Sequence, residues 1–391
     1  MINILVFSTL YPNASMPAHG VFVENRLRNL LSSGEVTAHV IAPVPWFPFN
    51  SRRFGSYAQF ARVPMREVRH GLTIEHPRYL VTPKIGWTFT PNAIYRAGLK
   101  TVRALMAEGK SFDMIDAHYF YPDGVAAVRL ANTFDLPVTV TARGTDINLI
   151  PQTPRARAQL VEASRGASHM IAVCQALKDT MIEIGMDGDK ITVLRNGVDL
   201  ELFTPQDRKM ARKTYGITKK AVVSVGGLIQ RKAHDIAIRA VAEMPDTELL
   251  IAGKGEEEGA LKTLVRTLGV KDRVRFLGLI PHEQLPVLYS AADIMSLTSS
   301  REGWANVLLE AMACGTPVVA SSVWGTPEVV AAPEAGRLMR DRTPRAFVEA
   351  AQNLLNDYPN RAATRRYAER FSWDETTQGQ LELFRRLTGK S

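Results

Sequence analysis

Two glutamates with seven residues between them carry the clearest chemical signal in the sequence. Glu302 lies in a glycine-containing loop after the apolar run 293–297, and Glu310 lies among helix-forming residues that end at Gly315. The pattern predicts a strand, a loop and a helix, with Asn306 as the helix N-cap. A helix N-terminus attracts phosphate, and carboxylates beside it suit the hydroxyls of a ribose or sugar. Two surface glutamates without a ligand are the simpler alternative.

Two cations precede another predicted helix. A strand at 221–225 leads into Gly226 and Gly227, and Arg231 and Lys232 come just before a helix expected at 233–244. The helix dipole and both cations would attract a diphosphate together. The alternative is a loop with exposed basic residues.

The first half of the chain places polar side chains after two predicted strands. His118 follows a strand at 114–117, and Arg143 and Asp146 follow a strand at 138–141. Ligands of parallel α/β sheets bind outside the carboxyl ends of the strands, so all three residues suit a binding cleft. A single histidine is more often structural, and that interpretation of His118 stays open.

The elements that would hold these residues alternate between strand and helix. A strand at 3–8, a long loop, a helix at 21–33 and a strand at 38–42 form a βαβ unit, which indicates a parallel sheet. Gly20 stands where the first helix begins, so the backbone there could approach a phosphate or sugar closely. A turn at 195–199 separates this series from a second one, which predicts a domain boundary near residues 195–205.

Composition indicates a globular protein with two domains. The chain has 391 residues, of which 46% are hydrophobic and 22% charged. No apolar run reaches the roughly 18–20 residues that span a membrane, and the N-terminus does not resemble a signal peptide. Cys174 and Cys314 lie in apolar, helical surroundings, so we expect two inert thiols in a reducing cytoplasm, with no disulfide framework and no metal site.

The net charge of +9 is concentrated in one segment. Residues 43–110 hold eleven Lys and Arg but three acids. Aromatic residues alternate with these cations: Trp46, Phe47, Phe49, Phe54, Tyr57, Phe60 and Trp87. The mixture suits peripheral contact with the inner face of an anionic membrane, or a phosphorylated lipid acceptor; a solvated basic face fits equally well. No nucleic-acid module is recognisable. We expect residues 43–83 to be an irregular insertion with a short strand at 72–75.

A glycine-rich turn after a strand at 248–252 is a candidate for a dinucleotide-binding site. Its spacing is G-x-G-x-x-x-G from Gly253, and three glutamates at 256–258 would face the pyrophosphate. Both features argue against NAD.

Several motifs together resemble a known family, the family 4 retaining glycosyltransferases of the GT-B architecture. The most specific is E-G-W-A-N-V-L-L-E-A-M-A-C-G-T-P-V-V-A at 302–320, followed by G-T-P-E at 325–328. N-G-V-D at 196–199, G-G-L-I-Q-R-K at 226–232 and F-S-W at 371–373 support it. A-H-Y-F-Y-P-D-G and A-R-G-T-D-I are similar to a subgroup that builds surface polysaccharides, including teichuronic acid.

The resemblance implies an α/β fold with two Rossmann-like domains that face each other across a cleft. Residues 1–198 would bind the acceptor, residues 199–373 would bind the nucleotide-sugar donor, and a helix at about 374–391 would return to the first domain. It also implies roles for matching residues. Glu302, Lys232, Arg231 and His118 would be catalytic. The donor would be bound by Gly20, Gly227, Leu279, Gly303, Trp304, Ala305, Asn306, Val307 and Glu310. Arg143 and Asp146 would lie on the acceptor side.

Within these roles, Glu302 would contact the donor sugar and Glu310 the ribose, while the backbone near Leu279 would contact the base. Two positions depart from the family pattern. Many members have Arg where Gly227 stands, and His is frequent where Arg143 stands. Arg231 could compensate for the first change, whereas the second could alter the chemistry on the acceptor side.

The predicted reaction moves a sugar from a UDP- or GDP-sugar to a hydroxyl of a glycan or lipid-linked acceptor, with retention at the anomeric carbon. Arg231, Lys232 and the helix N-termini would take the place of the divalent metal that other transferases use, in agreement with the lack of a D-x-D pair at a strand end, and no cofactor is expected. Three alternatives remain: a non-catalytic sugar-nucleotide-binding subunit of a polysaccharide assembly complex, an NAD-dependent oxidoreductase, and a sugar phosphorylase with a pyridoxal-phosphate lysine. The sugar, the base, the acceptor and the oligomeric state are not encoded in any motif.

Overall fold

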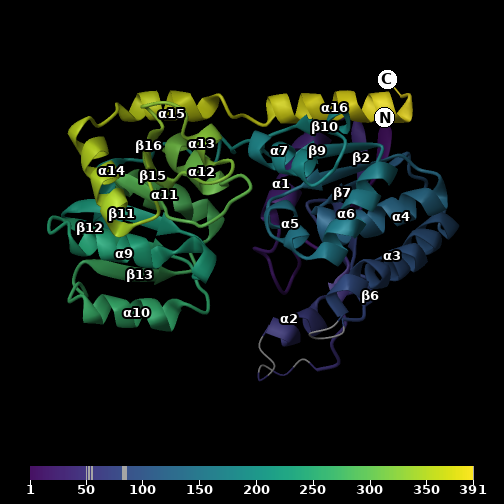
Figure 1. The fold of residues 1–391 in the computed structure, drawn as a ribbon, viewed down its shortest axis with the longest axis horizontal. Coiled ribbons are helices and arrows are strands. Elements are labelled where there is room, and N and C mark those ends of the chain that lie inside the picture. Colours follow the sequence, from purple (N-terminus) through teal and green to yellow (C-terminus); the bar gives the residue numbers. More distant parts are fainter. Residues whose placement is uncertain (50, 52, 54–55, 82–85, 391) are drawn as a thin grey trace. The chain divides into compact units, whose positions relative to one another are not determined.

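The computed structural model describes residues 1–49, 51, 53, 56–81 and 86–390. The chain divides into two compact units (Figure 1). Unit 1 comprises Met1–Arg195 and Asp374–Ser391, and unit 2 comprises Asn196–Trp373. The first division lies three residues before the predicted boundary at 198/199.

Unit 1 is built on an eight-stranded sheet with the order β10-β9-β8-β7-β1-β2-β5-β4. Its strands are β1 (Ile2–Phe7), β2 (Val36–Ile41), β4 (Arg66–Arg69), β5 (Leu72–Glu75), β7 (Met114–His118), β8 (Val138–Ala142), β9 (His169–Ala172) and β10 (Ile191–Val193). All neighbours pair in parallel except β4 and β5. A separate pair, β3 (Val44–Pro45) and β6 (Arg78–Tyr79), is also parallel.

The helices of unit 1 come from both ends of the sequence. They are α1 (Val21–Ser32), α2 (Ser56–Arg62), α3 (Thr90–Ala107), α4 (Val125–Phe134), α5 (Thr145–Asn148), α6 (Pro154–Gly166), α7 (Gln175–Glu183) and α16 (Asp374–Thr388). Leu381 and Phe384 of α16 are buried in the same hydrophobic cluster as Leu27 of α1 and Val6 of β1. Burial of these side chains explains why the last helix belongs to unit 1.

Unit 2 holds a six-stranded parallel sheet with the order β13-β12-β11-β14-β15-β16. Its strands are β11 (Lys220–Val225), β12 (Thr247–Ala252), β13 (Val274–Gly278), β14 (Ile294–Leu297), β15 (Val318–Ser321) and β16 (Gly336–Met339). Its helices are α8 (Arg208–Thr214), α9 (His234–Ala242), α10 (Glu258–Thr267), α11 (Leu285–Ala291), α12 (Asn306–Ala313), α13 (Thr326–Val329), α14 (Pro344–Asn356) and α15 (Arg361–Glu369). Apolar side chains of α9, α10 and α14 pack on β11 and β12 to form the core.

Two of the predicted motifs pack against each other inside unit 2. A Cβ atom at Gly197 would lie 2.6 Å from the backbone nitrogen of Trp373, and the Val198 N–H donates to the Phe371 carbonyl (2.9 Å). Glycine is therefore required at 197 because another backbone passes directly over it. This contact gives a structural explanation for the N-G-V-D motif and the F-S-W motif together, because the two segments pack against each other.

Two expectations about secondary structure were wrong, and one strand was missed. Asn306 is the first residue of α12 and Ala305 occupies the N-cap, where no side chain caps the helix. Residues 43–81 are more regular than an irregular insertion, because α2 and β3–β6 lie there; only β5 was expected. Strand β16 was missed entirely. Phe54, Arg52 and Lys84 of the basic, aromatic segment lie outside the described residues.

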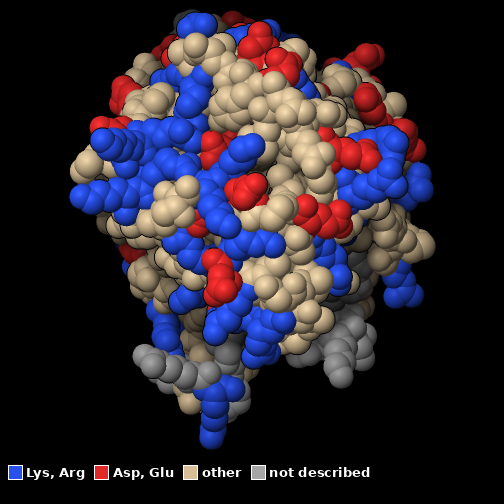
Figure 2. All heavy atoms as spheres, turned by 90° about the vertical axis from the view of Figure 1, so that its left-hand side faces the viewer, with Lys and Arg blue, Asp and Glu red and all other residues tan. Residues whose placement is uncertain are grey.

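The thiols lie in apolar surroundings as expected, whereas the positive charge of the surface is spread more widely than the sequence suggested. Cys174 and Cys314 are buried thiols that form no disulfide, and burial raises the pKa of the Cys314 thiol to about 12, so this thiol is inert. Within the described residues, no helix has both the length and the apolar character needed to cross a bilayer. Figure 2 shows Lys and Arg side chains gathered on a face that carries α10 and α14, so the positive charge is not confined to residues 43–110.

Candidate active site

Each sheet has a switch point, where the chain adds further strands on opposite sides of one central strand. In unit 2, β11 pairs with β12 on one side and with β14 on the other. In unit 1, β1 pairs with β2 on one side and with β7 on the other. The crevice outside the carboxyl ends at such a switch point is the usual ligand site of open α/β sheets. Gly20 and His118 lie at or after the ends of β1 and β7, and Arg231, Lys232 and Glu302 follow β11 and β14, whereas Arg143 and Asp146 follow β8.

In unit 2 the carboxylate of Glu302 pairs with both predicted cations. Lys232 Nζ lies 2.7 Å from Glu302 Oε1, and Arg231 Nη1 lies 3.2 Å from Oε2. Burial alone would raise the pKa of Glu302, but the two cations hold it below its usual value, so the group is ionised. The structure therefore brings together the three residues on which the sequence prediction depends.

Hydrogen bonds join the two loops that carry this cluster. The Ser300 N–H donates to the Arg231 carbonyl (2.8 Å), and the Thr298 hydroxyl donates to the Ala233 carbonyl (2.8 Å). Arg231 Nη1 also donates to the Arg301 carbonyl (2.9 Å). These bonds fix the loop after β14 against the turn after β11, so the protein itself holds the charged groups in place.

Glu310 has two protein partners that the sequence did not suggest. The fully buried Tyr289 hydroxyl donates to Oε2 (3.0 Å), and His282 Nε2 donates to Oε1 (3.4 Å). The carboxylate raises the pKa of His282, chiefly through this hydrogen bond. Tyr289 and His282 lie 21 and 28 residues before Glu310, and no motif links them to it. The carboxylate is thus held in one orientation.

The other residues that were predicted to bind the sugar donor differ in their exposure to solvent. Leu279 directly follows β13 and is 67% exposed. Trp304 and Ala305 are buried next to the N-terminus of α12. A Cβ atom at Gly227 would meet only the Lys254 carbonyl at 3.9 Å. The absence of a family arginine at 227 is therefore not forced by crowding.

In unit 1 His118 is enclosed by charged partners. Arg143 Nη2 donates to His118 Nδ1 (2.7 Å), which leaves the ring proton on Nε2, 3.3 Å from Asp116 Oδ2. Burial lowers the pKa of His118 to about 4, against the opposing effect of Asp116, so the ring is neutral at pH 7. Gln380 of α16 also donates to Asp116 Oδ2 (3.0 Å). Both ring nitrogens of His118 thus face protein groups.

Asp146 is fully buried, and its carboxylate accepts backbone hydrogen bonds. The donors are the N–H groups of Phe120 (2.6 Å), Gly144 (2.7 Å) and Arg143 (3.1 Å). Burial raises the pKa of Asp146 in spite of these bonds. The residue shapes the loops after β7 and β8, and its predicted place beside an acceptor stays a prediction.

Gly20 adopts a positive φ of 72° at the start of α1. A Cβ atom there would lie 2.3 Å from the carbonyl carbon of Leu10, so glycine is required by the loop itself. Approach of a phosphate to this backbone is a separate prediction that this contact does not test. The described residues contain no cluster of three or more His, Cys, Asp and Glu that could hold a metal ion.

Two family models cover most of the chain. The model for Glycosyltransferase Family 4 matches residues 57–202, and the model for Glycosyl transferases group 1 matches residues 207–371. The D-inositol 3-phosphate glycosyltransferase of Mycolicibacterium smegmatis is 31% identical over 309 residues, which are 75% of this chain and 71% of the relative. The enzyme of that name from Mycobacterium tuberculosis strain F11 is 36% identical over 53% of this chain and 46% of its own length.

Solved structures share the fold at low sequence identity. The sucrose-phosphate synthase of Thermosynechococcus elongatus superposes with a TM-score of 0.83 at 21% identity and covers all of both chains. Anabaena HepE, solved in complex with UDP and glucose, superposes with a TM-score of 0.75 at 21% identity over 99% of this chain and 100% of its own. The predicted α/β, GT-B type of fold is confirmed by these similarities.

Proposed function

The chain belongs to the glycosyltransferase family that these two models describe, and on that premise we propose that it transfers a sugar from a nucleotide diphosphate sugar to an acceptor hydroxyl. The acceptor would be a glycan or a lipid-linked molecule of surface polysaccharide synthesis, and UDP and GDP are the candidate nucleotides. The UDP-bound neighbour supports a nucleotide donor. Membership of this family also sets aside the nicotinamide-dependent oxidoreductase.

The pairing of Arg231 and Lys232 with Glu302 carries the proposal. Two cations on one side of a preorganised loop match the two charged phosphates of a leaving UDP or GDP. While no donor is bound, Glu302 neutralises the cations. When a diphosphate arrives, it would take over both charges and leave Glu302 to accept hydrogen bonds from sugar hydroxyls. Glu310, fixed by Tyr289, would accept from the ribose hydroxyls.

The proposed chemistry needs no metal and retains the anomeric configuration. The bond between the anomeric carbon and the diphosphate oxygen breaks, a bond to the acceptor oxygen forms on the same face, and the hydroxyl proton passes to the departing phosphate. The transition state has oxocarbenium character, and negative charge grows on the diphosphate, where Arg231 and Lys232 would stabilise it. Unit 2 would bind the donor and unit 1 the acceptor.

A donor screen tests this function directly. Thermal unfolding is measured with UDP-, GDP- and ADP-sugars, because a ligand at a hundred times its Kd stabilises the folded state by about 2.7 kcal/mol. Slow hydrolysis of the stabilising donor without acceptor would separate an active enzyme from a non-catalytic binding subunit. A chain that binds none of these nucleotides would disprove the proposal.

Peripheral membrane contact is part of the proposal and depends on a different region. Large apolar side chains in the stretch from the end of β3 to the residue after β6 are strongly exposed: Trp46 (50%), Phe49 (53%), Tyr57 (48%) and Leu80 (70%). Arg53 and Arg62 in the same stretch are also exposed. Aromatic side chains among cations suit the interface of an anionic bilayer. Co-sedimentation with phosphatidylglycerol vesicles but not with phosphatidylcholine vesicles is expected, and sedimentation with neither would contradict it.

A further inference from the structure

Unit 1 contains a cavity that none of the predicted site residues lines. It has a volume of about 200 Å³ and lies between the loop after β1, the chain after β2 and α2. Its walls include Thr9 and His19 from the loop after β1, together with Pro45 of β3, Phe60 of α2 and Tyr79 of β6. Because β1, β2 and β5 are parallel, the loops that follow them meet at one edge of the sheet, the edge that also carries His118.

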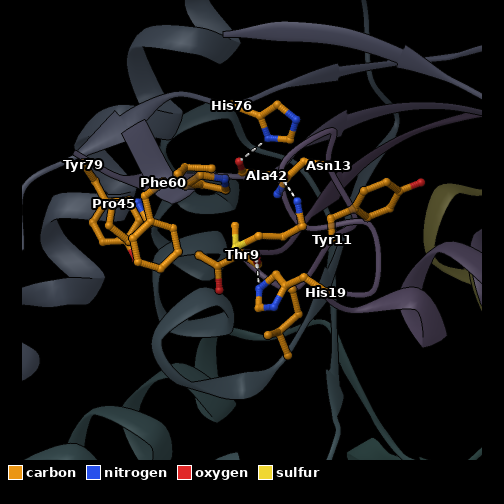
Figure 3. Close-up of a pocket in the computed structure, with 13 residues that line it drawn as sticks. Thr9, Tyr11, Asn13, His19, Ala42, Pro45, Phe60, His76 and Tyr79 are labelled. Carbon is orange, nitrogen blue, oxygen red and sulfur yellow. Dashed lines mark hydrogen bonds between the residues drawn. The ribbon is translucent and has the colours of Figure 1, made fainter. Parts of the chain in front are cut away.

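The cavity has an apolar side and a polar side. Figure 3 shows Phe60, Tyr79 and Pro45 together on one side, and Thr9 and His19 on the other. The first three residues come from α2, β6 and β3, whereas the last two belong to the loop after β1. A ligand that fits must therefore present one apolar face and one edge that forms hydrogen bonds.

His19 supplies a defined hydrogen-bond acceptor. Its Nε2 lies 3.1 Å from the Thr9 carbonyl, which can only accept, so the ring proton is on Nε2 and Nδ1 keeps its lone pair. Burial lowers the pKa of His19, which favours this neutral form. Nδ1 has no hydrogen-bond partner among the residues that the structure describes, and it can accept from a hydroxyl.

The loop that carries His19 is fixed at both ends. Asp123 Oδ2 accepts from the Thr9 N–H (2.7 Å) and hydroxyl (2.9 Å), and Asn13 Oδ1 accepts from the Met16 N–H (2.9 Å). The contact between Gly20 and Leu10 closes the other end. The cavity is therefore preformed, which lowers the entropic cost of binding. Asp123 follows β7, so the same contacts join the cavity to the loop after His118.

We propose that this cavity binds one pyranose ring of the acceptor, with the ring stacked on Phe60 and Tyr79 and one hydroxyl donating to His19. The proposal rests on the proposed function, since it names the class of acceptor that the glycosyltransferase recognises. A pyranose has a C–H face for the aromatic side and hydroxyls for the polar side. The volume is below the roughly 300–1,000 Å³ of pockets for larger ligands, in keeping with a single ring. An alkyl chain would leave His19 Nδ1 buried without a partner, which is unfavourable.

Saturation-transfer NMR on the full chain tests this site without knowledge of the natural acceptor. The probes are the methyl α- and β-pyranosides of glucose, galactose and mannose, with octanoate as the alkyl alternative. We expect transfer to the ring protons of at least one glycoside. His19→Ala and Phe60→Ala should each weaken its binding about fivefold, in line with the loss of roughly 1 kcal/mol. Phe60→Ala leaves the loop contacts of His19 intact, so a folding defect of one variant would not affect the other.

Phe89→Ala is the matched control, because this ring is 63% exposed and does not line the cavity. Unchanged glycoside binding in both cavity variants, or binding of octanoate alone, would overturn the proposal. Donor binding is measured on the same samples by thermal shift. If donors bind and no glycoside does, the assignment of the cavity fails while the transferase function stands. If no donor binds either, the function itself fails.

Discussion

The two sheet edges differ in what their charged side chains are paired with. At the edge of unit 2, Arg231 and Lys232 keep 26% and 14% of their side chains exposed and share a single carboxylate, Glu302. At the edge of unit 1, His118 and Asp146 are almost completely enclosed, and their polar atoms face protein groups. The charged side chains at the edge of unit 2 are thus partly accessible to solvent, whereas those at the edge of unit 1 are buried and hydrogen-bond the loops around them.

Under the proposed function, this difference would separate residues that act on a ligand from residues that position others. A motif residue in unit 2 is expected to change binding or turnover when it is replaced. A motif residue in unit 1 is expected to change stability first, because its removal leaves buried partners unpaired. Under this interpretation the acceptor would be recognised in unit 1 by loop residues such as His19, and not by His118, Arg143 and Asp146 at the strand ends.

The largest expected effect lies at the edge of unit 2. Lys232→Ala should lower turnover by a factor on the order of 10²–10³, because it removes a preorganised cation from the leaving diphosphate. Steady-state kinetics with the donor found in the screen would measure it. Lys262→Ala is the control, since Lys262 is exposed on α10 and pairs with Glu258. Near-normal turnover of Lys232→Ala would remove the distinction between the two edges.

The buried carboxyl of Asp123 predicts that the stability of the protein depends on pH. Burial raises the pKa of this carboxyl to about 7, and its Oδ1 atom has no hydrogen-bond partner among the described residues. An unfolded Asp titrates near 3.9, so between about pH 4 and 7 the unfolded chain has lost a proton that the folded chain keeps. Stability therefore falls as pH rises through this window, by roughly 3 kcal/mol between pH 5 and 8.

Asp123→Asn should remove most of this pH dependence, since the amide oxygen can still accept from Thr9. Urea denaturation at pH 5 and pH 8 would measure the difference. Asp135→Asn, an exposed position at the end of α4, should behave like the unsubstituted chain. If the Asp123→Asn variant keeps the full pH dependence, the buried carboxyl is not the group responsible.

Prediction from the sequence succeeded where one motif contains both the strand end and the helix that follows it. The loop at 298–305 and helix α12 were found because apolar and helix-forming runs flank Glu302 within a few residues. The adjacency of β11 and β14 then brought Arg231 and Lys232 to Glu302. Their direct ion pairs were not predicted, because a charge pair 70 residues apart leaves no local pattern.

Prediction failed where separate segments meet. The cavity of unit 1 joins the loop after β1, β3, α2 and β6, and no spacing in the sequence relates His19 to Phe60. The one available signal was a histidine directly before Gly20 in a long βα loop. Asn306 was misplaced as a cap because Ala305, which has no capping side chain, takes that position. Strand β16 has only four residues and no alternating pattern.

Glu310→Ala should weaken nucleotide binding by about 10- to 100-fold, because hydrogen bonds to a charged group contribute roughly 1.5–3 kcal/mol. Titration calorimetry with UDP and GDP would measure the affinity. Glu349→Ala on α14 is the control, since this glutamate is half-exposed and pairs with Arg345. An unchanged affinity in the Glu310 variant would mean that the carboxylate belongs to the framework, as Asp146 does.

Tyr289→Phe tests the smallest change, because it removes a single hydroxyl that would act on the nucleotide only through Glu310. The ring stays in the core, and the lost hydrogen bond to Oε2 is worth about 1 kcal/mol, so the Kd for the nucleotide should rise about fivefold. Turnover at saturating donor should change little. Tyr358→Phe loses a hydroxyl bonded to the Asp293 carbonyl (2.8 Å) and should lower stability without any change in Kd. If Tyr289→Phe and Tyr358→Phe both lower stability and leave the Kd unchanged, the hydrogen bond from Tyr289 to Glu310 serves only the core. Unit 2 would then resemble unit 1 more closely than its partly accessible cations suggest.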